Sequence, residues 1–502
     1  GCPVSQFPVL CDYVRRVLIS DQMPSLGSTA KERENRLKRG GLTIKTLIDP
    51  KAQQAAEEAV AKTVGPTDPV WGGTVLIQPG TGLITAMAQS RTKLGSGEGE
   101  TWLQANASSD FGGVGGFQAG STFKPFVIAT ALEQGVPTST SFESKSRMQF
   151  RGYKFKNCEG PFTYLGDYAP KNYDGDHGNI NMLEATQKSV NTYFIQLEAK
   201  VGICASIDTA QKLGVKLADG DDMRKMAEYP SWVLGVAEVT PLSMAEAYAT
   251  FANRGVHCNP IILQSVQTQD GTEVEIPSAD CKQVISSDVA DGVSSILSTV
   301  MTQGTGAPAR LPDGRPQAGK TGTTNDTQSV WFAGYTPDMA GVAYIAADVT
   351  SSRFKGKESK PIVGLRMSTG KVLEGSGGHD AGGIWKSAMS EALKDIPASN
   401  FQEPNKRILE GEKVPVPSVA GMTEEQARQT LEAEGFSVGR TEQLSPQPAG
   451  PYLGKVFPST RAAKYSTVQL VYSKGPIPTD TPTVAPGQPG QPSAPATPEG
   501  ER

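Results

Sequence analysis

Three strand-like runs follow one another closely in the second half of the chain, and they restrict its fold more than any other feature. The runs are RPQAGKTGTT (315–324), SVWFAGYT (329–336) and GVAYIAADV (341–349). Only short linkers join them, and parallel neighbours would need long crossovers, so we expect antiparallel strands at a sheet edge. Helix-like segments lie on both sides, such as SDVADGVSSILSTVMTQGTG before and GIWKSAMSEALKD after. The region 41–402 is therefore predicted to be an α+β domain.

The length, the apolar runs and the net charge of the chain limit the number of domains and exclude some classes of protein. A chain of 502 residues suggests about three domains. No stretch approaches the roughly 18 apolar residues that a membrane-spanning helix needs. The net charge is −4 with the two signs well mixed, which argues against nucleic acid as the main partner. The chain opens GCPVSQFP without a methionine, and residues 1–40 suggest a tether or partial helix of a processed or trimmed fragment.

The composition changes near residue 403. Residues 408–475 combine a helix with several strands and carry their own apolar residues, so we expect a small α/β domain that folds alone. From residue 476 the chain is almost entirely Pro, Gly, Thr, Ser and Ala. Such a segment cannot bury enough apolar surface to fold, and it is predicted to be disordered.

Cysteine positions predict at least one cross-link. Cys258 and Cys281 flank IILQSVQTQDGTEVEIP, which reads as a hairpin with its turn at Asp270-Gly271. The two cysteines are nearly equidistant from that turn, so either a disulfide or two buried thiols is expected. Cys2–Cys11 is a second candidate pair. Disulfides would indicate an oxidising compartment outside the cytoplasm. The three histidines are scattered, so neither a metal site nor a Ser–His triad is expected.

A serine and a lysine three residues apart form the first chemical signal, in GSTFKPF (120–126). The bare pattern Ser-x-x-Lys occurs five times, and most matches of this kind are solvated surface pairs. The matches begin at Ser28, Ser90, Ser121, Ser352 and Ser368. Ser121 differs because it directly follows a glycine-rich run and opens a predicted helix.

Two further motifs select Ser121. SVN (189–191) is the only Ser-x-Asn in the chain and KTG (320–322) the only Lys-Thr-Gly. The order SxxK, SxN, KTG is the signature of serine β-lactamases and penicillin-binding proteins. A serine needs a base at neutral pH, and Lys124 shares a helix face with Ser121. Burial and a second cation, Lys320, would lower the pKa of Lys124 enough for it to act as that base.

Longer segments carry a closer resemblance. GGLTIKTLIDPKAQ, LGVAEVTPLSMAEAYATFANRG, AGKTGTTNDTQSVWFAGYTPD and GGHDAGGIWKSAM look like the transpeptidase half of class A, bifunctional penicillin-binding proteins. The resemblance covers about 41–395. One departure is QAGSTFKPF where the family usually has QPGSTFKPF, a change outside the chemistry. The resemblance implies a penicillin-binding, serine β-lactamase-like fold and no cofactor.

The resemblance also implies a role for each matching residue. Ser121 is the nucleophile and Lys124 is its general base. Ser189 and Asn191 form the second motif, and Lys320 is the second cation. The strand segment Thr321, Gly322 and Thr323 binds the substrate carboxylate, and the backbone N–H groups of Ser121 and Thr323 form the oxyanion hole. The implied reaction is D,D-transpeptidation of peptidoglycan stem peptides ending in D-Ala-D-Ala, through an acyl-enzyme on Ser121. The implied partners are stem-peptide donors, amine acceptors and β-lactams, with other cell-wall proteins as a further candidate class.

Residues 413–475 resemble a PASTA module, which suggests a Gram-positive or actinobacterial source. Its usual QSPAPG-like turn is replaced by FPSTRAAKYS, so ligand binding and a spacer role are both open. Residues 1–40 resemble only the linker that follows a glycosyltransferase domain, so no glycosyltransferase activity is expected in this chain. The resemblance places the domain on the cell-wall side of the membrane, with an N-terminal transmembrane anchor expected in the full-length protein.

Three alternatives to a transpeptidase stay open. A β-lactamase would need a device that activates water, and no Glu-x-x-x-Asn loop is found at the usual place. A D,D-carboxypeptidase differs only in sending water, in place of an amine, to the acyl-enzyme. A β-lactam-sensing or wall-binding protein could keep the same motifs and be acylated without turnover.

Overall fold

The structure is a computed structural model that describes residues 1–477. Most of the tail predicted from residue 476 lies outside these described residues. The chain divides into two compact units. The first comprises residues 1–414 with 462–466, and the second comprises residues 415–461 with the described residues from 467 onward. Within residues 1–477, no helix is both long and apolar enough to cross a membrane.

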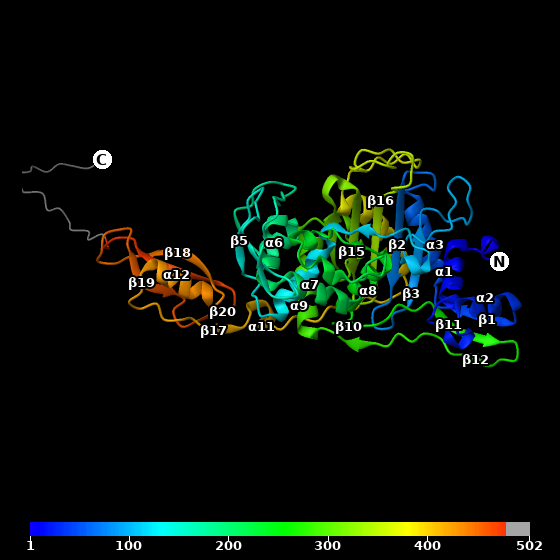
Figure 1. Cartoon of the computed structure of the whole chain (residues 1–502), viewed down its shortest axis with the longest axis horizontal. Coiled ribbons are helices and arrows are strands. Elements are labelled where there is room, and N and C mark those ends of the chain that lie inside the picture. The colour runs from blue at the N-terminus through cyan, green and yellow to red at the C-terminus, as the bar shows by residue number, and fades with distance from the viewer. Residues whose placement is uncertain (478–502) are drawn as a thin grey trace, which may run out of the picture. The chain divides into compact units, whose positions relative to one another are not determined.

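A five-stranded antiparallel sheet forms the centre of the first unit (Figure 1). In spatial order its strands are β14 (Ala318–Thr323), β15 (Ser329–Tyr335), β16 (Ala340–Ala347), β2 (Val70–Ile77) and β3 (Ile84–Gln89). The three strand-like runs of the sequence are thus confirmed as consecutive antiparallel neighbours. The KTG motif (320–322) lies on β14, at the edge of the sheet.

Both faces of this sheet are buried, so almost every residue of its strands is shielded from solvent. Along β16, Val342 and Tyr344 belong to one hydrophobic core, and Ala343 and Ile345 belong to another. This alternation follows from the period of two residues in a strand. Helices α3 (Pro50–Ala61) and α10 (Gly382–Ala392) pack on one face, and α8 (Pro241–Ala252) and α9 (Ser287–Gln303) on the other.

A helical region continues beyond α8 and α9. Its helices are α4 (Lys124–Glu133), α5 (Met182–Lys188), α6 (Asn191–Val201) and α7 (Ile203–Leu213). All but α7 are expected from the sequence. Helix α7 carries Ile203, Ile207, Ala210 and Leu213, all buried, at helical spacing. The helix is hard to predict from the sequence because polar residues separate these apolar positions and because Gly202 comes directly before it.

Residues 1–40 are more ordered than a tether. They form α1 (Pro8–Ile19) and α2 (Ala30–Arg39) within the first unit. Leu10, Tyr13, Val17 and Leu18 of α1 are buried in the main core of this unit. The stretch is rich in charge, so its apolar face was not evident from composition.

Short ladders complete the first unit. They are β1 (Leu42–Thr46) with β11 (Leu263–Thr268) and β12 (Glu273–Val274), β10 (Val256–His257) with β13 (Lys282–Gln283), β4 (Phe117–Gln118) with β9 (Glu238–Val239), β5 (Ser141–Glu143) with β8 (Asn179–Asn181), and β6 (Lys154–Lys156) with β7 (Pro161–Thr163). A last short helix, α11 (Lys406–Glu410), also belongs to this unit. Trp232, Trp331 and Trp385 are fully buried.

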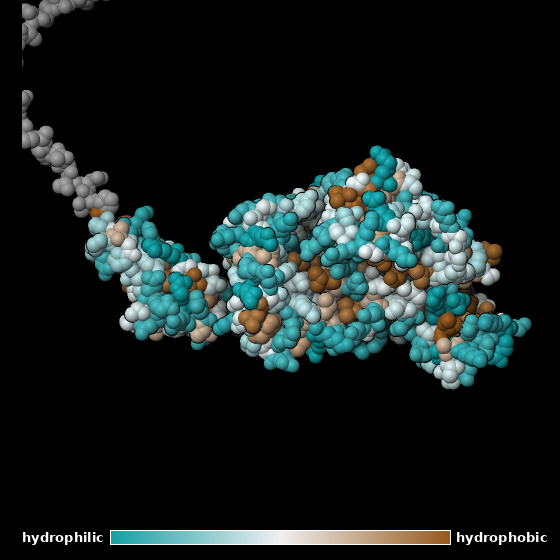
Figure 2. Space-filling model, turned by 45° about the horizontal axis from the view of Figure 1, so that its top comes forward, coloured by the Kyte–Doolittle hydropathy of each residue, from teal (hydrophilic) through white to brown (hydrophobic). Residues whose placement is uncertain are grey.

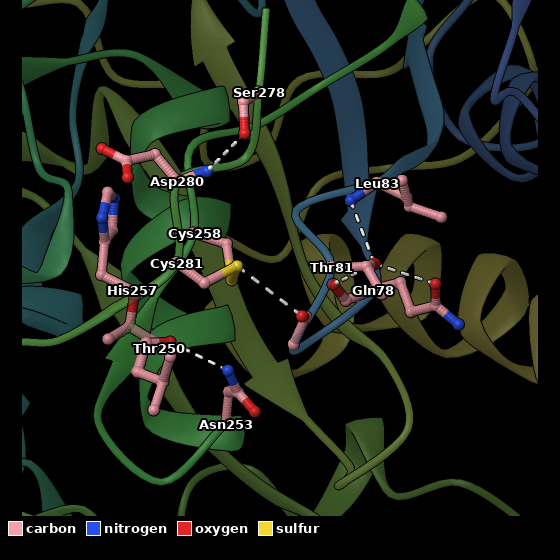
Figure 3. Close-up of a disulfide and its surroundings, with 12 residues drawn as sticks. Gln78, Thr81, Leu83, Thr250, Asn253, His257, Cys258, Ser278, Asp280 and Cys281 are labelled. Carbon is pink, nitrogen blue, oxygen red and sulfur yellow. Dashed lines mark hydrogen bonds between the residues drawn. A yellow bond between two sulfur atoms is a disulfide. The ribbon is translucent and has the colours of Figure 1, made fainter. Parts of the chain in front are cut away.

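The predicted hairpin and its disulfide are both present. β11 pairs with β12 around the Asp270-Gly271 turn, and β10 pairs with β13 further from it. Cys258 and Cys281 come next to this outer ladder and form a disulfide, beside the β2–β3 turn that carries Gln78 and Thr81 (Figure 3). Cys2–Cys11 is a disulfide too, and Cys158–Cys204 is a third, which the sequence reasoning did not anticipate.

The second unit contains α12 (Glu424–Ala433) and a three-stranded sheet of β18 (Ser437–Gln443), β21 (Thr467–Ser473) and β19 (Tyr452–Phe457). Two short strands, β17 (Lys413–Pro415) and β20 (Arg461–Ala463), pair with each other. Along the chain, β17 comes before α12, and β20 comes between β19 and β21. Helix α12 begins with a capping box between Thr423 and Gln426. The second unit buries apolar residues from its helix, strands and connections, as a small α/β domain requires. They are Val419, Ala427, Leu431, Phe436, Val468 and Leu470. Figure 2 shows hydrophilic residues over most of the visible surface, with smaller hydrophobic patches.

Candidate active site

Ser121 lies in a 3₁₀ turn, η4 (Gly120–Phe123), that leads directly into α4. Phe123 and Phe126 anchor this segment in the core, where both are fully buried. Gly120 has φ +60°, and a Cβ there would lie 2.8 Å from backbone atoms of Thr323. Glycine is therefore required for the serine turn to approach the KTG strand this closely.

Lys124 is completely buried one turn after Ser121. Its Nζ donates to Ser189 O at 2.7 Å, to Ser189 Oγ at 3.1 Å and to Asn191 Oδ1 at 2.8 Å. The ammonium thus has three acceptors, all from the SxN motif. The structure joins the first two motifs of the sequence through this one side chain.

Ser189 connects Lys124 to the third motif. Lys320 Nζ donates to Ser189 Oγ at 2.7 Å and to Thr321 O at 3.0 Å. Ser189 Oγ therefore accepts hydrogen bonds from two lysines, which leaves its own proton free to be donated elsewhere. Ser189 caps α5 in the left-handed region at φ 57°, a conformation that costs a non-glycine residue roughly 1 kcal/mol or more.

Both lysines have lowered pKa values. Burial places the pKa of Lys124 well below its usual value, and the nearby charge of Lys320 lowers it further, against an opposing effect of Asp174. Burial also lowers the pKa of Lys320 to about 7. Desolvation disfavours the charged form of a lysine, so a neutral amine becomes accessible near neutral pH. A neutral Lys124 can accept a proton, as a general base must.

The KTG strand lies close to the serine turn. A Cβ on Gly322 would lie 2.3 Å from Ala119 O and 2.9 Å from Thr122 Cγ2, so only glycine allows this contact. Thr323 is partly exposed next to Gly120. Thr321 Oγ1 is 2.7 Å from Thr305 Oγ1, which orients the Thr321 hydroxyl.

The structure thus brings most of the predicted site residues together. Lys124, Ser189, Asn191 and Lys320 form one hydrogen-bonded network. The Ser121 hydroxyl is partly exposed and lies outside this network, without a hydrogen bond to any residue in 1–477. The candidate nucleophile thus lies one helical turn before the candidate base.

Two polar contributors escaped sequence reasoning. Asp174 acts electrostatically on Lys124, and its Oδ1 lies 2.7 Å from His177 Nε2. The loop that carries them is held to the site because Asn191 Nδ2 donates to Lys171 O at 2.9 Å. Thr305, which orients Thr321, is the other. No motif marks these residues, since their role depends on contacts distant in sequence.

Two of the other Ser-x-x-Lys serines, Ser28 and Ser90, have ordinary structural partners. Ser28 Oγ donates to Glu32, and Ser90 Oγ accepts from Gly72 N. Neither Ser28 nor Ser90 contacts the lysine network.

Comparison with known protein families agrees with this geometry. The model of the penicillin-binding protein transpeptidase domain matches residues 72–367, more than half of the chain. The model of the PASTA domain matches residues 414–474. The matched transpeptidase region includes all three motifs.

Similar curated proteins are named penicillin-binding protein 1A. The one from Mycobacterium tuberculosis is 31% identical over 389 residues, which cover 74% of this chain and 42% of the relative. The one from Aquifex aeolicus is 29% identical over 293 residues, which cover 58% of this chain and 35% of the relative. The chain thus spans less than half the length of these relatives.

Solved structures extend the likeness to the fold. Penicillin-binding protein PonA1 from Mycobacterium tuberculosis has a TM-score of 0.56 at 27% identity, covering 74% of this chain and 89% of PonA1. A PonA1 structure in complex with penicillin V gives the same TM-score at 28% identity, over 74% of this chain and 91% of PonA1. With the transpeptidase model matched over more than half its length, this chain belongs to the penicillin-binding protein transpeptidase family and carries a C-terminal PASTA domain.

Proposed function

We propose that the protein is a peptidoglycan D,D-transpeptidase that cross-links stem peptides through an acyl-enzyme on Ser121. The observation that carries the proposal is the shared hydroxyl of Ser189, which accepts hydrogen bonds from Lys124 and Lys320 one turn from a free serine. This network provides a base, a proton relay and a second cation, the three groups that serine acylation at neutral pH requires.

Acylation would use Lys124 as the base. Ser121 Oγ attacks the carbonyl carbon between the two D-alanines, and its proton passes to neutral Lys124. The oxyanion is stabilised by the backbone N–H groups of Ser121 and Thr323. The C–N bond then breaks, and the departing D-alanine amine takes its proton from Lys124 through Ser189. The product is an ester on Ser121 and one free D-alanine.

Deacylation would reverse the direction of proton transfer. The amine of a second stem attacks the ester carbonyl and gives up a proton through Ser189 to Lys124. The C–O bond of the ester breaks, Ser121 regains the proton, and a new amide joins the two stems. Attack by water in place of the amine would make the enzyme a D,D-carboxypeptidase.

The remaining predicted site residues would hold the donor. Lys320 and the segment Thr321–Thr323 bind the terminal carboxylate of the peptide. Asn191 has one Nδ2 hydrogen left beyond its bond to Lys171 O, and this hydrogen can donate to a carbonyl of the substrate. β-Lactams mimic the donor and would acylate the same serine, and the solved complex of PonA1 with penicillin V supports β-lactam binding here.

The setting we propose is the cell-wall side of the membrane. Stem peptides are found there, and three disulfides fit an oxidising compartment. The PASTA domain would act in the same compartment, as a wall-binding module or as a spacer.

Intact-mass analysis after penicillin treatment tests the proposed nucleophile. One adduct is expected on the wild type, on the peptide that contains Ser121, and none on Ser121→Ala. An adduct on Ser28, Ser90, Ser352 or Ser368 would disprove the assignment.

A second assay separates the three activities. The enzyme is given a D-Ala-D-Ala donor together with an amine acceptor, and products are identified by mass. A cross-linked product supports the transpeptidase. Hydrolysed donor alone indicates a carboxypeptidase, and acylation without turnover indicates a β-lactam sensor.

A further inference from the structure

A pocket of about 100 Å³ lies where β15 begins and β16 ends in the central sheet, beside β4 and β9. Its walls include Leu103, Phe117, Gln118, Glu238, Gln328 and Val349. None of these residues belongs to the three motifs. The pocket is therefore a surface separate from the residues of the three motifs, with both polar and apolar walls.

Backbone pairing ties this pocket to the nucleophile. Gln118 of β4 lies directly opposite Glu238 of β9, so the two side chains share a face. Gln118 Oε1 accepts from Gln328 Nε2 at 2.9 Å, and Gln118 O accepts from Ser329 Oγ at 2.6 Å. Gln118 comes three residues before Ser121, which limits their separation to about 10 Å even for an extended chain.

Glu238 is the unpaired charge on the pocket wall. Its side chain is exposed and makes no ion pair or hydrogen bond with the residues of 1–477. The other wall carboxylate, Asp348, is already paired with Arg91 at 2.7 Å. Lys360 lowers the pKa of Glu238 from a distance, but its Nζ donates to Glu358 O at 3.2 Å. Partial desolvation and the charge of Asp219 raise the pKa of Glu238. A cation bound beside this carboxylate would stabilise its charged form and lower the pKa again.

We propose that this pocket binds the side-chain amine of the donor stem peptide, with Glu238 as its counter-ion. The inference rests on the proposed transpeptidase function. Donor and acceptor stems are copies of one unit, so the donor carries the same kind of amine that the acceptor uses for attack. The apolar walls at Leu103, Phe117 and Val349 fit the aliphatic part of such a side chain.

The donor amine is the better occupant for a geometric reason. The acceptor amine must reach the acyl carbon on Ser121, so it cannot remain at Glu238 during the reaction. The donor amine does not react. Gln118 lies opposite Glu238 and at most about 10 Å from Ser121, so the pocket is near enough for a side chain of a donor bound at Ser121 to extend toward it. Holding the donor amine at Glu238 would keep it from competing with the acceptor.

The test uses two donor peptides, Nα-acetyl-L-lysyl-D-alanyl-D-alanine and the same peptide acetylated on its side-chain amine. D-Alanine release is measured as kcat/KM, and each value is divided by the same enzyme's rate of acylation by benzylpenicillin to correct for general damage. We expect the wild type to prefer the free amine by about tenfold, the value of a contact worth about 1.4 kcal/mol. Glu238→Gln should reduce that ratio to near one. The matched control, Glu133→Gln at the far end of α4, should keep it.

Several results would overturn the inference. An unchanged ratio in Glu238→Gln, or no preference in the wild type, would show that Glu238 does not bind the donor amine. If the free side-chain amine is preferred only when two acceptor peptides compete for the acyl-enzyme, and not in the donor, the pocket binds the acceptor stem. Binding of both peptides to Ser121→Ala gives the same comparison without turnover. If benzylpenicillin also fails to acylate the wild type, the proposed function fails together with this inference.

Discussion

Lys320 Nζ lies 2.7 Å from Ser189 Oγ, although 131 residues separate the two in the chain. The same hydroxyl accepts a hydrogen bond from Lys124 at 3.1 Å. A serine that bridges two buried lysines couples their proton affinities, because a charge on one disfavours a charge on the other. Through this hydroxyl, residues of all three motifs form one hydrogen-bonded network.

The first prediction concerns the base. Lys124→Ala, and the shape-preserving Lys124→Met, should slow acylation by a fluorescent penicillin about 10²–10⁴-fold, because no group remains to accept the Ser121 proton. Lys188→Met, which removes a surface lysine next to Ser189, should stay close to the wild type. Lys124 is not the base if a folded Lys124→Met protein is acylated within a few-fold of the wild-type rate.

The second prediction concerns the pH dependence of stability. Lys320 has a pKa of about 7 in the folded protein, against about 10.4 in an unfolded chain. Between these values the unfolded state binds more protons, so the free energy of unfolding rises with pH through this window. Lys320→Met removes the contribution. The gain in Tm of Lys320→Met over the wild type should therefore shrink from pH 7 to pH 9.5, and a constant difference would contradict the lowered pKa.

The third prediction concerns the contact between the serine turn and the KTG strand. An alanine at 322 would place its Cβ 2.3 Å from Ala119 O, so the strand must move. A displacement near 1 Å at a reacting group can cost about 10²-fold in rate. Gly322→Ala should lose penicillin acylation to about this degree while its circular dichroism spectrum stays native.

Gly383→Ala is the matched control, because a Cβ at this exposed helical position meets nothing within 4 Å. It should be neutral or slightly stabilising, by no more than about 1 kcal/mol. Equal activity of the two variants would show that the close approach at Gly322 has no catalytic importance.

The fourth prediction compares two truncations. The sequence places the end of the catalytic domain at 402, but in the structure α11 packs against α4 and α9 of the first unit. Thr138 N donates to Leu409 O at 2.9 Å, and Ile408 lies over Gly292. A chain ending at Gly411 should keep penicillin acylation within a few-fold of the full chain, since all three motifs lie within 121–322.

A chain ending at Gln402 should unfold at a lower temperature, because it loses the contacts of α11 with α4 and α9 and the hydrogen bond from Thr138 N to Leu409 O. Thermal unfolding followed by fluorescence distinguishes the two truncations. Identical melting of both chains would mean that α11 contributes nothing to the catalytic domain. Loss of acylation in the longer chain would mean that the PASTA domain supports the active site.

The sequence by itself determined the class of fold and the identity of the motifs. Three strand-like runs joined by short linkers predicted the β14–β15–β16 meander, and local helix patterns predicted α3, α8, α9 and α10. The predicted hairpin placed Cys258 near Cys281 and left a disulfide or two buried thiols open; the structure shows the disulfide. These features were predictable because each depends on residues that are near one another in the chain.

Only the tertiary structure decided which residues are chemically active and how. The pKa of Lys124 depends on burial by distant segments and on the charge of Lys320. The buried face of α1, the third disulfide, and the positions of Asp174 and Glu238 depend on long-range packing in the same way. Burial and proximity between residues far apart in the chain leave no local pattern. The sequence therefore identified the motifs, but the environment that gives Lys124 a usable proton affinity is a property of the folded protein.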